Sequence, residues 1–149
     1  MNEIEVAYRL LRGNGLARVP EYQTPGASGM DLHASLEEPV TLAPGGFALI
    51  PTGIAVSIPQ GYEAQIRPRS GLAARHGVTV LNAPGTIDSD YRGEVCVIMV
   101  NFGSGDFTIN NGDRIAQMIF SQVITAQLVL SQELDSTERE DGGFGHTGV

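Results

Sequence analysis

The stretch FALIPTGIAVSI, residues 47–58, sets a pattern that much of the chain repeats. It is a short apolar run with several β-branched residues, and such a composition favours a β-strand. Pro51 lies inside the run, and proline cannot donate a hydrogen bond to a strand ladder. The stretch therefore predicts a strand with an edge or a bend at Pro51.

Glycine and proline punctuate the chain, with 19 glycines and 8 prolines among its 149 residues. They separate short segments rich in Val, Ile, Thr and Phe, which predicts many short strands in an all-β sandwich or barrel. Further strands are expected at residues 62–68, 93–102, 106–109 and 113–130. Only SGLAARHG, residues 70–77, is typical of a helix, with Ser70 as its N-cap and Gly77 as its stop.

Composition narrows the possible partners. The net charge is −8, so sequence-independent binding to nucleic acid or to an anionic membrane is not expected. All nine basic residues are arginine, which suits forked binding of phosphate or carboxylate, although compositional bias explains this equally well. A lone Cys96 fits a reducing compartment. The N-terminus resembles neither a secretory signal nor a membrane span, so a cytoplasmic protein is expected.

The chain is expected to form one β-domain at residues 1–132 and a flexible tail at residues 133–149. The length suits a single domain of ordinary size, and no linker or repeat divides it. The tail, ELDSTEREDGGFGHTGV, is first acidic and then glycine-rich, with almost nothing apolar to pack. It is predicted to be mobile in the free protein.

The stretch NAPGTIDSDYRGEV, residues 82–95, carries the densest set of polar groups between two apolar segments. A hairpin or tight loop there would expose main-chain N–H and C=O groups in a row, and the Asn82 amide adds a donor and an acceptor. Such a set can bind a pyrimidine edge. The alternative is a solvated turn in which Asp88 and Asp90 only satisfy backbone amides, and the loop by itself favours neither.

Three other features suggest binding groups, each with an ordinary structural alternative. RPRSGLA, residues 67–73, places arginines at a helix start, where an anion binds well, but surface arginines beside a cap are common. Asp31 lies in an apolar strand, so its carboxylate must be solvated, paired or bound to the water shell of a cation. The structural alternative is a capping or turn role. Gln117 breaks the apolar strand face that it shares with Ile115 and Ile119, so it either pairs in the core or faces a pocket.

Five ordered segments together resemble the motifs of the trimeric dUTPase family, the deoxyuridine triphosphate nucleotidohydrolases. They are ASGMDLHA (27–34), PRSGLA (68–73), NAPGTIDSDYRGE (82–94), GDRIAQMIF (112–120) and REDGGFGHTG (139–148). The resemblance implies a jelly-roll-like distorted β-barrel with one short helix, and a homotrimer with three active sites between subunits. The implied reaction cleaves dUTP with water to dUMP and pyrophosphate, with Mg²⁺ held by the triphosphate. That reaction would limit uracil in DNA and supply dUMP for thymidylate synthesis.

The resemblance also implies roles for individual residues. Asp88 would orient and deprotonate the attacking water, Gln117 would help to fix that water or a phosphate oxygen, and Asp31 would bind water on the metal without touching the ion. The implied substrate-binding residues are Arg69, Ser70 and Gly71 at the phosphates, Asn82, Gly85, Thr86 and Ile87 at the uracil edge, Tyr91 under the deoxyribose, Cys96 in the pocket wall, and Arg139, Phe144, Gly145, His146 and Thr147 in the closing tail.

Some residues depart from the family pattern, and other functions compete. Met30 stands where an aromatic residue is frequent, while Glu140 and Asp141 add negative charge near the implied γ-phosphate position. A related dCTP deaminase would need a glutamate base in the 82–95 region, where this chain has Asp88 and Tyr91. A nucleotide-binding switch that has lost turnover would show damage to Asp88, Arg69 or the tail. A structural jelly-roll subunit explains the strands but not the five segments.

Overall fold

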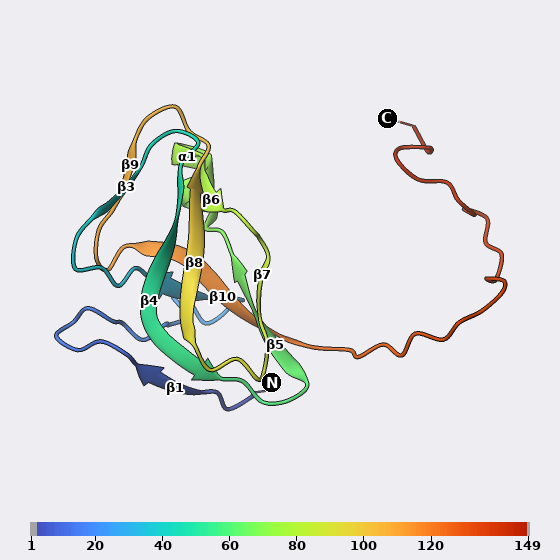
Figure 1. The fold of residues 1–149 in the computed structure, drawn as a ribbon, viewed down its shortest axis with the longest axis horizontal. Coiled ribbons are helices and arrows are strands. Elements are labelled where there is room, and N and C mark those ends of the chain that lie inside the picture. The colour runs from blue at the N-terminus through green and yellow to red at the C-terminus, as the bar shows by residue number, and fades with distance from the viewer. Residues whose placement is uncertain (1–2, 149) are drawn as a thin grey trace.

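Two antiparallel sheets and a strand pair build the body of the protein, in a computed structural model that describes residues 3–148 (Figure 1). Met1, Asn2 and Val149, the last residue of the predicted tail, lie outside the described residues. One sheet has the order β1 (Ala7–Leu10), β4 (Phe47–Ser57), β8 (Glu94–Asn101) and β6 (Val78–Val80). The other has the order β2 (Met30–His33), β10 (Arg114–Gln122), β5 (Tyr62–Arg67) and β7 (Gly85–Ile87). Strands β3 (Val40–Leu42) and β9 (Phe107–Ile109) form the pair.

The apolar core lies between the sheets, and alternate residues in the first part of β8 and in β5 point into it. Along β8, Val95, Val97 and Met99 are almost fully buried, and β4 contributes Ile50 and Ile54 from the same sheet. The second sheet contributes Leu32, Ala64, Ile66 and Met118. This arrangement, with one short helix among the described residues, confirms the predicted all-β, jelly-roll-like fold.

Strand β4 bends where the sequence predicts it. Pro51 pairs with Cys96, but the next partners are Ala55 and Glu94, so the register shifts between these positions. Gly53 lies in the shifted segment with φ +72°, a conformation that favours glycine. Strand β1 pairs only with residues 54–57 of β4, so at Pro51 the ladder partner of β4 within the described structure is β8 alone. Pro51 thus lies at a bend and outside the β1 ladder, as the prediction allows.

The helix α1 (Ser70–His76) ends as predicted but begins differently. Gly77 adopts the left-handed conformation, and its N–H donates to the Ala73 carbonyl. Ser70 is not the N-cap: Arg69 occupies that position with an extended backbone and makes no side-chain cap bond. The Arg69 carbonyl already accepts from the Ala73 N–H (3.2 Å), which makes Ser70 the first helical residue.

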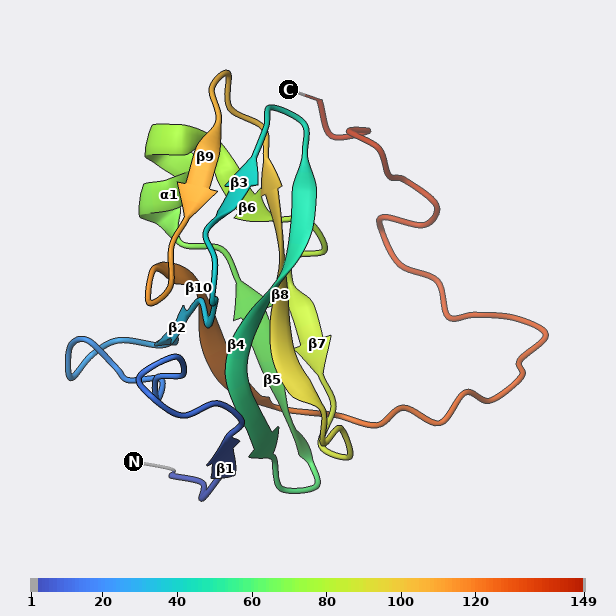
Figure 2. The ribbon, with the colours of Figure 1, turned by 60° about the vertical axis from the view of Figure 1, so that its left-hand side comes forward.

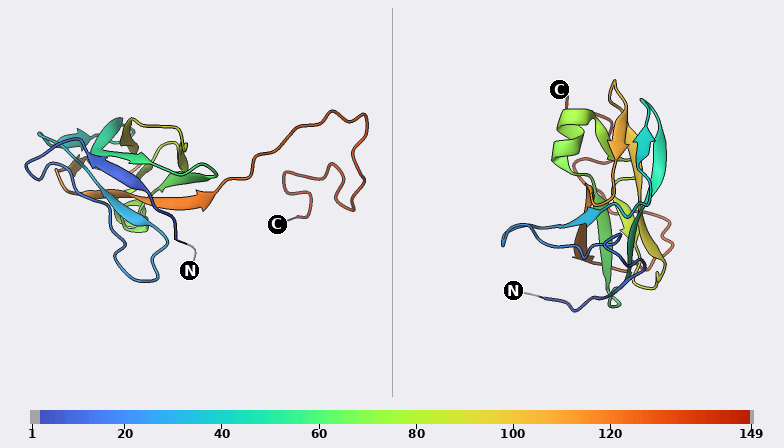
Figure 3. Two further views of the ribbon diagram at one scale, coloured as in Figure 1. Left: turned by 90° about the horizontal axis from the view of Figure 1, so that it is seen from below. Right: turned by 90° about the vertical axis from the view of Figure 1, so that its left-hand side faces the viewer.

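The structure excludes one alternative and corrects one strand in the region that follows. Of the hairpin and the tight loop predicted at residues 82–95, the hairpin is excluded, because β7 pairs with β5 while β8 pairs with β4 and β6 in the other sheet, and residues 88–93 form a loop between them. The strand predicted at residues 113–130 ends at Gln122, which pairs with Tyr62, the first residue of β5. Beyond Gln122 no partner strand continues among the described residues. Residues 123–148 extend away from the body (Figures 2 and 3).

Asn101 is a buried polar residue that ties the end of β3 and the β8–β9 loop to β8. Its amide nitrogen donates to the carbonyls of Leu42 and Gly105, both at 2.8 Å, and its amide oxygen accepts from the Gly103 N–H at 2.9 Å. The side chain is 0% exposed, so water cannot replace these bonds.

Replacing Asn101 with leucine is expected to lower the free energy of unfolding by at least about 2 kcal/mol, because buried backbone groups lose their partners. Urea unfolding followed by circular dichroism measures this. The same change at Asn110, which is exposed, is the matched control and should cost less than about 0.5 kcal/mol. Equal losses in the two variants would contradict a structural role for the Asn101 amide.

Candidate active site

A pocket between β7 and β8 collects five of the residues predicted to bind substrate. It has a volume of about 60 Å³. The predicted residues that line it are Asn82, Gly85, Thr86, Ile87 and Cys96. Its remaining lining residues, Ile66, Val80, Val97 and Ile98, are apolar. We call this the β7–β8 pocket.

Strand β7 presents its backbone to this pocket. It is the last strand of its sheet in the described structure and pairs with β5 along one edge only, from Gly85 opposite Ile66 to Ile87 opposite Ala64. An edge strand carries a row of N–H and C=O groups that a neighbour can bind. The side chain of Asn82 lies close to this row, since a methyl group on Gly85 would lie 3.4 Å from its nitrogen.

Asp88 and Tyr91 lie in the loop that follows β7. Asp88 is exposed, and its carbonyl accepts from the Tyr91 N–H (3.2 Å), which makes the segment a turn. The Tyr91 hydroxyl donates to the Glu94 carbonyl (2.9 Å). The ring lies directly on Gly93, where a Cβ atom would be 2.4 Å from the Tyr91 oxygen. The loop that carries Asp88 thus holds the Tyr91 ring in a defined position.

Cys96 forms part of the pocket wall and is half-buried, so the wall position that the family resemblance implies agrees with the structure. Burial raises the pKa of its thiol, and the Glu94 carboxylate raises it further. Glu94 is itself paired with Arg12, which lowers the pKa of the Glu94 carboxyl. The Cys96 thiol is therefore protonated, and uncharged, at neutral pH.

A second group of residues gathers around Asp31 on β2. The Asp31 side chain is 13% exposed and lies between two guanidinium groups, Arg69 Nε at 3.5 Å and Arg114 Nη1 at 3.2 Å. The turn role considered as an alternative for Asp31 is wrong, because the carboxylate is paired across strands. The sequence offered no sign of Arg114 as a partner, since 83 positions separate it from Asp31. We call this group the Asp31 cluster.

Gln117 and the start of α1 adjoin the Asp31 cluster. The Gln117 amide nitrogen donates to the Pro68 carbonyl at 3.0 Å, one residue before Arg69. Arg69 also donates to the Arg114 carbonyl at 3.1 Å. Ser70 is exposed in the first helical turn. The space beside Gly71 is open, since a Cβ atom added to this residue would have nothing within 4 Å. The predicted alternation of strand faces fails near Arg114 because β10 is bulged there, so Ile115 and Ala116 are both buried.

The tail residues are not brought to either group. Arg139 Nε donates to the Gly142 carbonyl (2.8 Å), within the tail itself, and the Phe144 side chain is fully exposed. Gly145, His146 and Thr147 are likewise exposed. Glu140 accepts from the Thr137 N–H at 2.7 Å, so its carboxylate is engaged locally. The roles implied for the tail remain predictions.

One sheet connects the two groups of site residues: Asp31 pairs with Gln117, Gln117 pairs with Arg67, and the neighbouring Ile66 pairs with Gly85 of the pocket. In Figures 1 and 2, α1 lies at one end of the body and the β7–β8 loop at the other. A cavity of about 640 Å³ lies elsewhere, beside β1 and β10, and holds none of the predicted site residues.

Within residues 3–148, no group of three or more His, Cys, Asp or Glu side chains could hold a metal ion, and no helix is long and apolar enough to cross a bilayer.

Comparisons with known proteins agree with the family resemblance. The dUTPase family matches residues 16–148. A deoxyuridine 5'-triphosphate nucleotidohydrolase from Chlamydia pneumoniae is 62% identical over 132 residues, covering 88% of this chain and 91% of that protein. The protein of the same name from Caulobacter vibrioides is 52% identical over 148 residues, covering 98% of this chain and 96% of that protein.

Solved structures show the same fold. The Staphylococcus bacteriophage 80alpha dUTPase with dUpNHpp has a TM-score of 0.87 at 28% identity, covering 97% of this chain and 99% of that one. A dUTPase variant from phage phi11 of S. aureus, described with a structural Mg(II) ion, has a TM-score of 0.79 at 27% identity, covering 89% of this chain and 100% of that one. Since the family match and these relatives extend over nearly all of the chain, the protein belongs to the dUTPase family.

Proposed function

We propose that the protein hydrolyses dUTP to dUMP and pyrophosphate, with the β7–β8 pocket as the nucleoside site. The observation that carries this proposal is the gathering of Asn82, the β7 backbone and Cys96 around one pocket, with Asp88 and Tyr91 in the adjoining loop. The relatives named as deoxyuridine triphosphate nucleotidohydrolases support the same reaction. A cytoplasmic role in nucleotide metabolism fits this substrate.

Uracil is recognised by hydrogen bonds that imitate base pairing. The free edge of β7 supplies N–H donors and C=O acceptors in a fixed row, and Asn82 adds one of each. Cytosine is rejected because its amine would face a donor. Thymine differs by one methyl group, which apolar fit alone discriminates by only about 1–3 kcal/mol, so its rejection is steric. Tyr91, held on Gly93, packs under the deoxyribose and leaves no room for a 2′-hydroxyl.

Asp88 acts as the general base for the attacking water. The Asp88 carboxylate is exposed and can accept a proton from water. The water attacks the α-phosphorus of dUTP and gives one proton to Asp88, while the bond between that phosphorus and the bridging oxygen breaks and pyrophosphate leaves. Gln117, fixed by its bond to the Pro68 carbonyl, helps to orient that water or a phosphate oxygen. Arg69, Ser70 and Gly71 bind the phosphates at the start of α1.

The donor set fits a Mg²⁺ ion that the substrate brings with it. Asp31 already neutralises Arg69 and Arg114, and no second carboxylate completes a cage with it among the described residues. Mg²⁺ typically binds through substrate phosphates and keeps several waters, so Asp31 needs to reach only one of those waters. When bound, the ion offsets phosphate charge, which lets an acidic protein hold a triphosphate.

We further propose that the active protein is a homotrimer whose sites lie between subunits. Two observations support association. Phe47 and Leu49, on the outer face of β4, are 65% and 63% exposed, and the extended segment after β10 exposes Ile124, Leu128 and Leu130. Exposed apolar surface of this kind marks interaction sites. Association also explains how the β7–β8 loop and the start of α1, at opposite ends of the body, can serve one substrate.

Substrate selectivity tests the proposed reaction directly. With Mg²⁺ and dUTP, dTTP, dCTP or UTP supplied separately, only dUTP should release pyrophosphate at an appreciable rate, and none should release ammonia. Coupled pyrophosphate and ammonia assays measure both products. Comparable turnover of dTTP, or ammonia from dCTP, would contradict the assignment.

Replacing Asp88 with asparagine should lower kcat by about 10²- to 10⁴-fold while dUTP still binds, because the amide keeps the shape but cannot accept the proton. Single-turnover kinetics and equilibrium binding of dUTP measure the two effects. Asp90→Asn, two residues along the same loop, is the matched control. A near-normal kcat in Asp88→Asn would place the base elsewhere.

The tail is proposed to close over the bound nucleotide, with Phe144 on the uracil ring, Arg139 at the γ-phosphate, and Gly145, His146 and Thr147 around the anion. A chain that ends at Glu138 should keep its fold and trimeric state but lose about 10- to 100-fold in kcat/KM, because stacking on a base contributes about 1–3 kcal/mol. Steady-state kinetics, thermal unfolding and light scattering check these three properties. Full activity in the shortened chain would remove the tail from the mechanism.

A further inference from the structure

The irregular pairing of β4 with β8 leaves backbone groups that side chains must satisfy. Between the pairs Pro51–Cys96 and Ala55–Glu94, three residues of β4 face a single residue of β8. The Glu94 carboxylate accepts from the Gly53 N–H at 3.1 Å, and the Thr52 hydroxyl donates to the Val95 carbonyl. The bulge is thus held together by side chains in place of ladder bonds.

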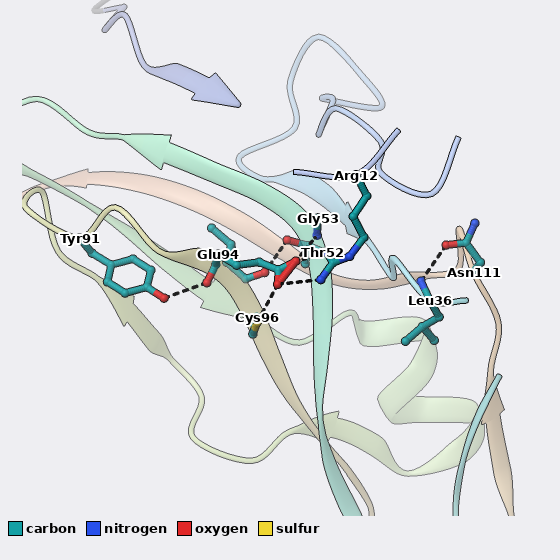
Figure 4. Close-up of polar contacts among 9 residues, drawn as sticks. Arg12, Leu36, Thr52, Gly53, Tyr91, Glu94, Cys96 and Asn111 are labelled. Carbon is teal, nitrogen blue, oxygen red and sulfur yellow. Dashed lines mark hydrogen bonds and ion pairs between the residues drawn. The ribbon is translucent and has the colours of Figure 1, made fainter. Parts of the chain in front are cut away.

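Arg12 completes this arrangement from outside the sheet. It follows β1, and its neighbour Leu11 donates its N–H to the Gly53 carbonyl at 2.7 Å. The Arg12 guanidinium binds both oxygens of Glu94, through Nη1 to Oε1 and through Nη2 to Oε2 at 3.1 Å (Figure 4). Such a forked pair fixes the direction of the carboxylate as well as its charge.

Glu94 connects this pair to two groups of the proposed nucleoside site. Its carbonyl accepts the Tyr91 hydroxyl at 2.9 Å, and its carboxylate accepts the Cys96 thiol at 3.9 Å. Figure 4 shows Tyr91, Glu94, Cys96 and Arg12 in one connected network. Tyr91 is proposed to support the sugar, and Cys96 lines the β7–β8 pocket.

We propose that Arg12 and Glu94 are positioning residues for the nucleoside site: their pair locks the start of β8 and thereby fixes the Tyr91 ring and the Cys96 wall. The inference rests on the proposed function of the β7–β8 pocket. Neither residue contacts substrate. Their pair affects how tightly the nucleoside binds and how strictly the rigid site excludes thymine. Asp88, which activates the water, is outside their network.

Arg12→Met is expected to raise the Kd for dUMP and the KM for dUTP by about 5- to 10-fold and to leave kcat nearly unchanged, since paired groups of this kind couple strongly. The ratio of dTTP to dUTP turnover should rise. For Arg12→Lys, the Kd for dUMP and the KM for dUTP should lie between those of the wild type and of Arg12→Met, because an ammonium cannot bind both carboxylate oxygens in the same fork. Arg9→Met is the matched control: Arg9 lies on the preceding strand, is exposed, and has no ion pair within residues 3–148.

Cys96 provides a local readout of the pocket wall. It is the single cysteine of the chain, so its reaction with an aromatic disulfide reagent can be followed by absorbance. In Glu94→Gln the reaction at pH 7.5 should be several-fold faster, because the carboxylate that raises the thiol pKa is gone and the wall is looser. Saturating dUMP should slow the reaction in the wild type.

The possible outcomes separate the positioning role from the proposed function. If dUMP protects Cys96 but Arg12→Met and Glu94→Gln bind dUMP like the wild type, the positioning role is wrong and the pocket assignment stands. If dUMP does not protect Cys96 in the wild type, the pocket assignment fails and the positioning role fails with it. Should Arg12→Met unfold at the assay temperature, Arg12→Lys and Glu94→Gln decide the question by the same measurements.

Discussion

The antiparallel pairing of β4 with β8 is the interaction on which the rest of the structure depends. These two strands form the centre of one sheet, and their inward residues, among them Ile50, Val97 and Met99, fill the core against the second sheet. The pairing is regular from Phe47 to Pro51 and then interrupted. Because Thr52 and Glu94 bind backbone groups freed by that interruption, and Arg12 holds the Glu94 carboxylate, the strands stay together while the chain changes direction.

This interruption also sets the place of the chemistry. Strand β8 begins at Glu94, where the loop that carries Asp88 and Tyr91 ends, and the bulge lies opposite Val95, just before Cys96. Strand β7 runs along the edge of the other sheet, so the pocket forms where the two sheets diverge. The start of β8 is fixed on one side of the pocket, and the edge of β7 is free on the other. This combination suits the proposed nucleoside site, which must distinguish similar flat rings.

The charged half of the proposed site is built differently. Asp31, Arg69 and Arg114 come from three segments and neutralise one another across strands, which keeps two arginines and a carboxylate together on an acidic protein. Arg69 directly precedes α1, which lies at the opposite end of the body from the β7–β8 loop. In the proposed homotrimer, association between copies would bring these two ends together.

Local backbone preferences and ordered motifs were enough to predict the strand composition, the bend at Pro51, the end of the helix at Gly77 and the family. Which strands pair depends on how the sheets pack, so the fold was needed to exclude the β7–β8 hairpin and to show that the last strand ends at Gln122. It also revealed the pairs Asp31–Arg114 and Arg12–Glu94. Partners 83 and 82 positions apart leave no periodic signal, since their contact arises from how the sheets pack and not from local chain preference.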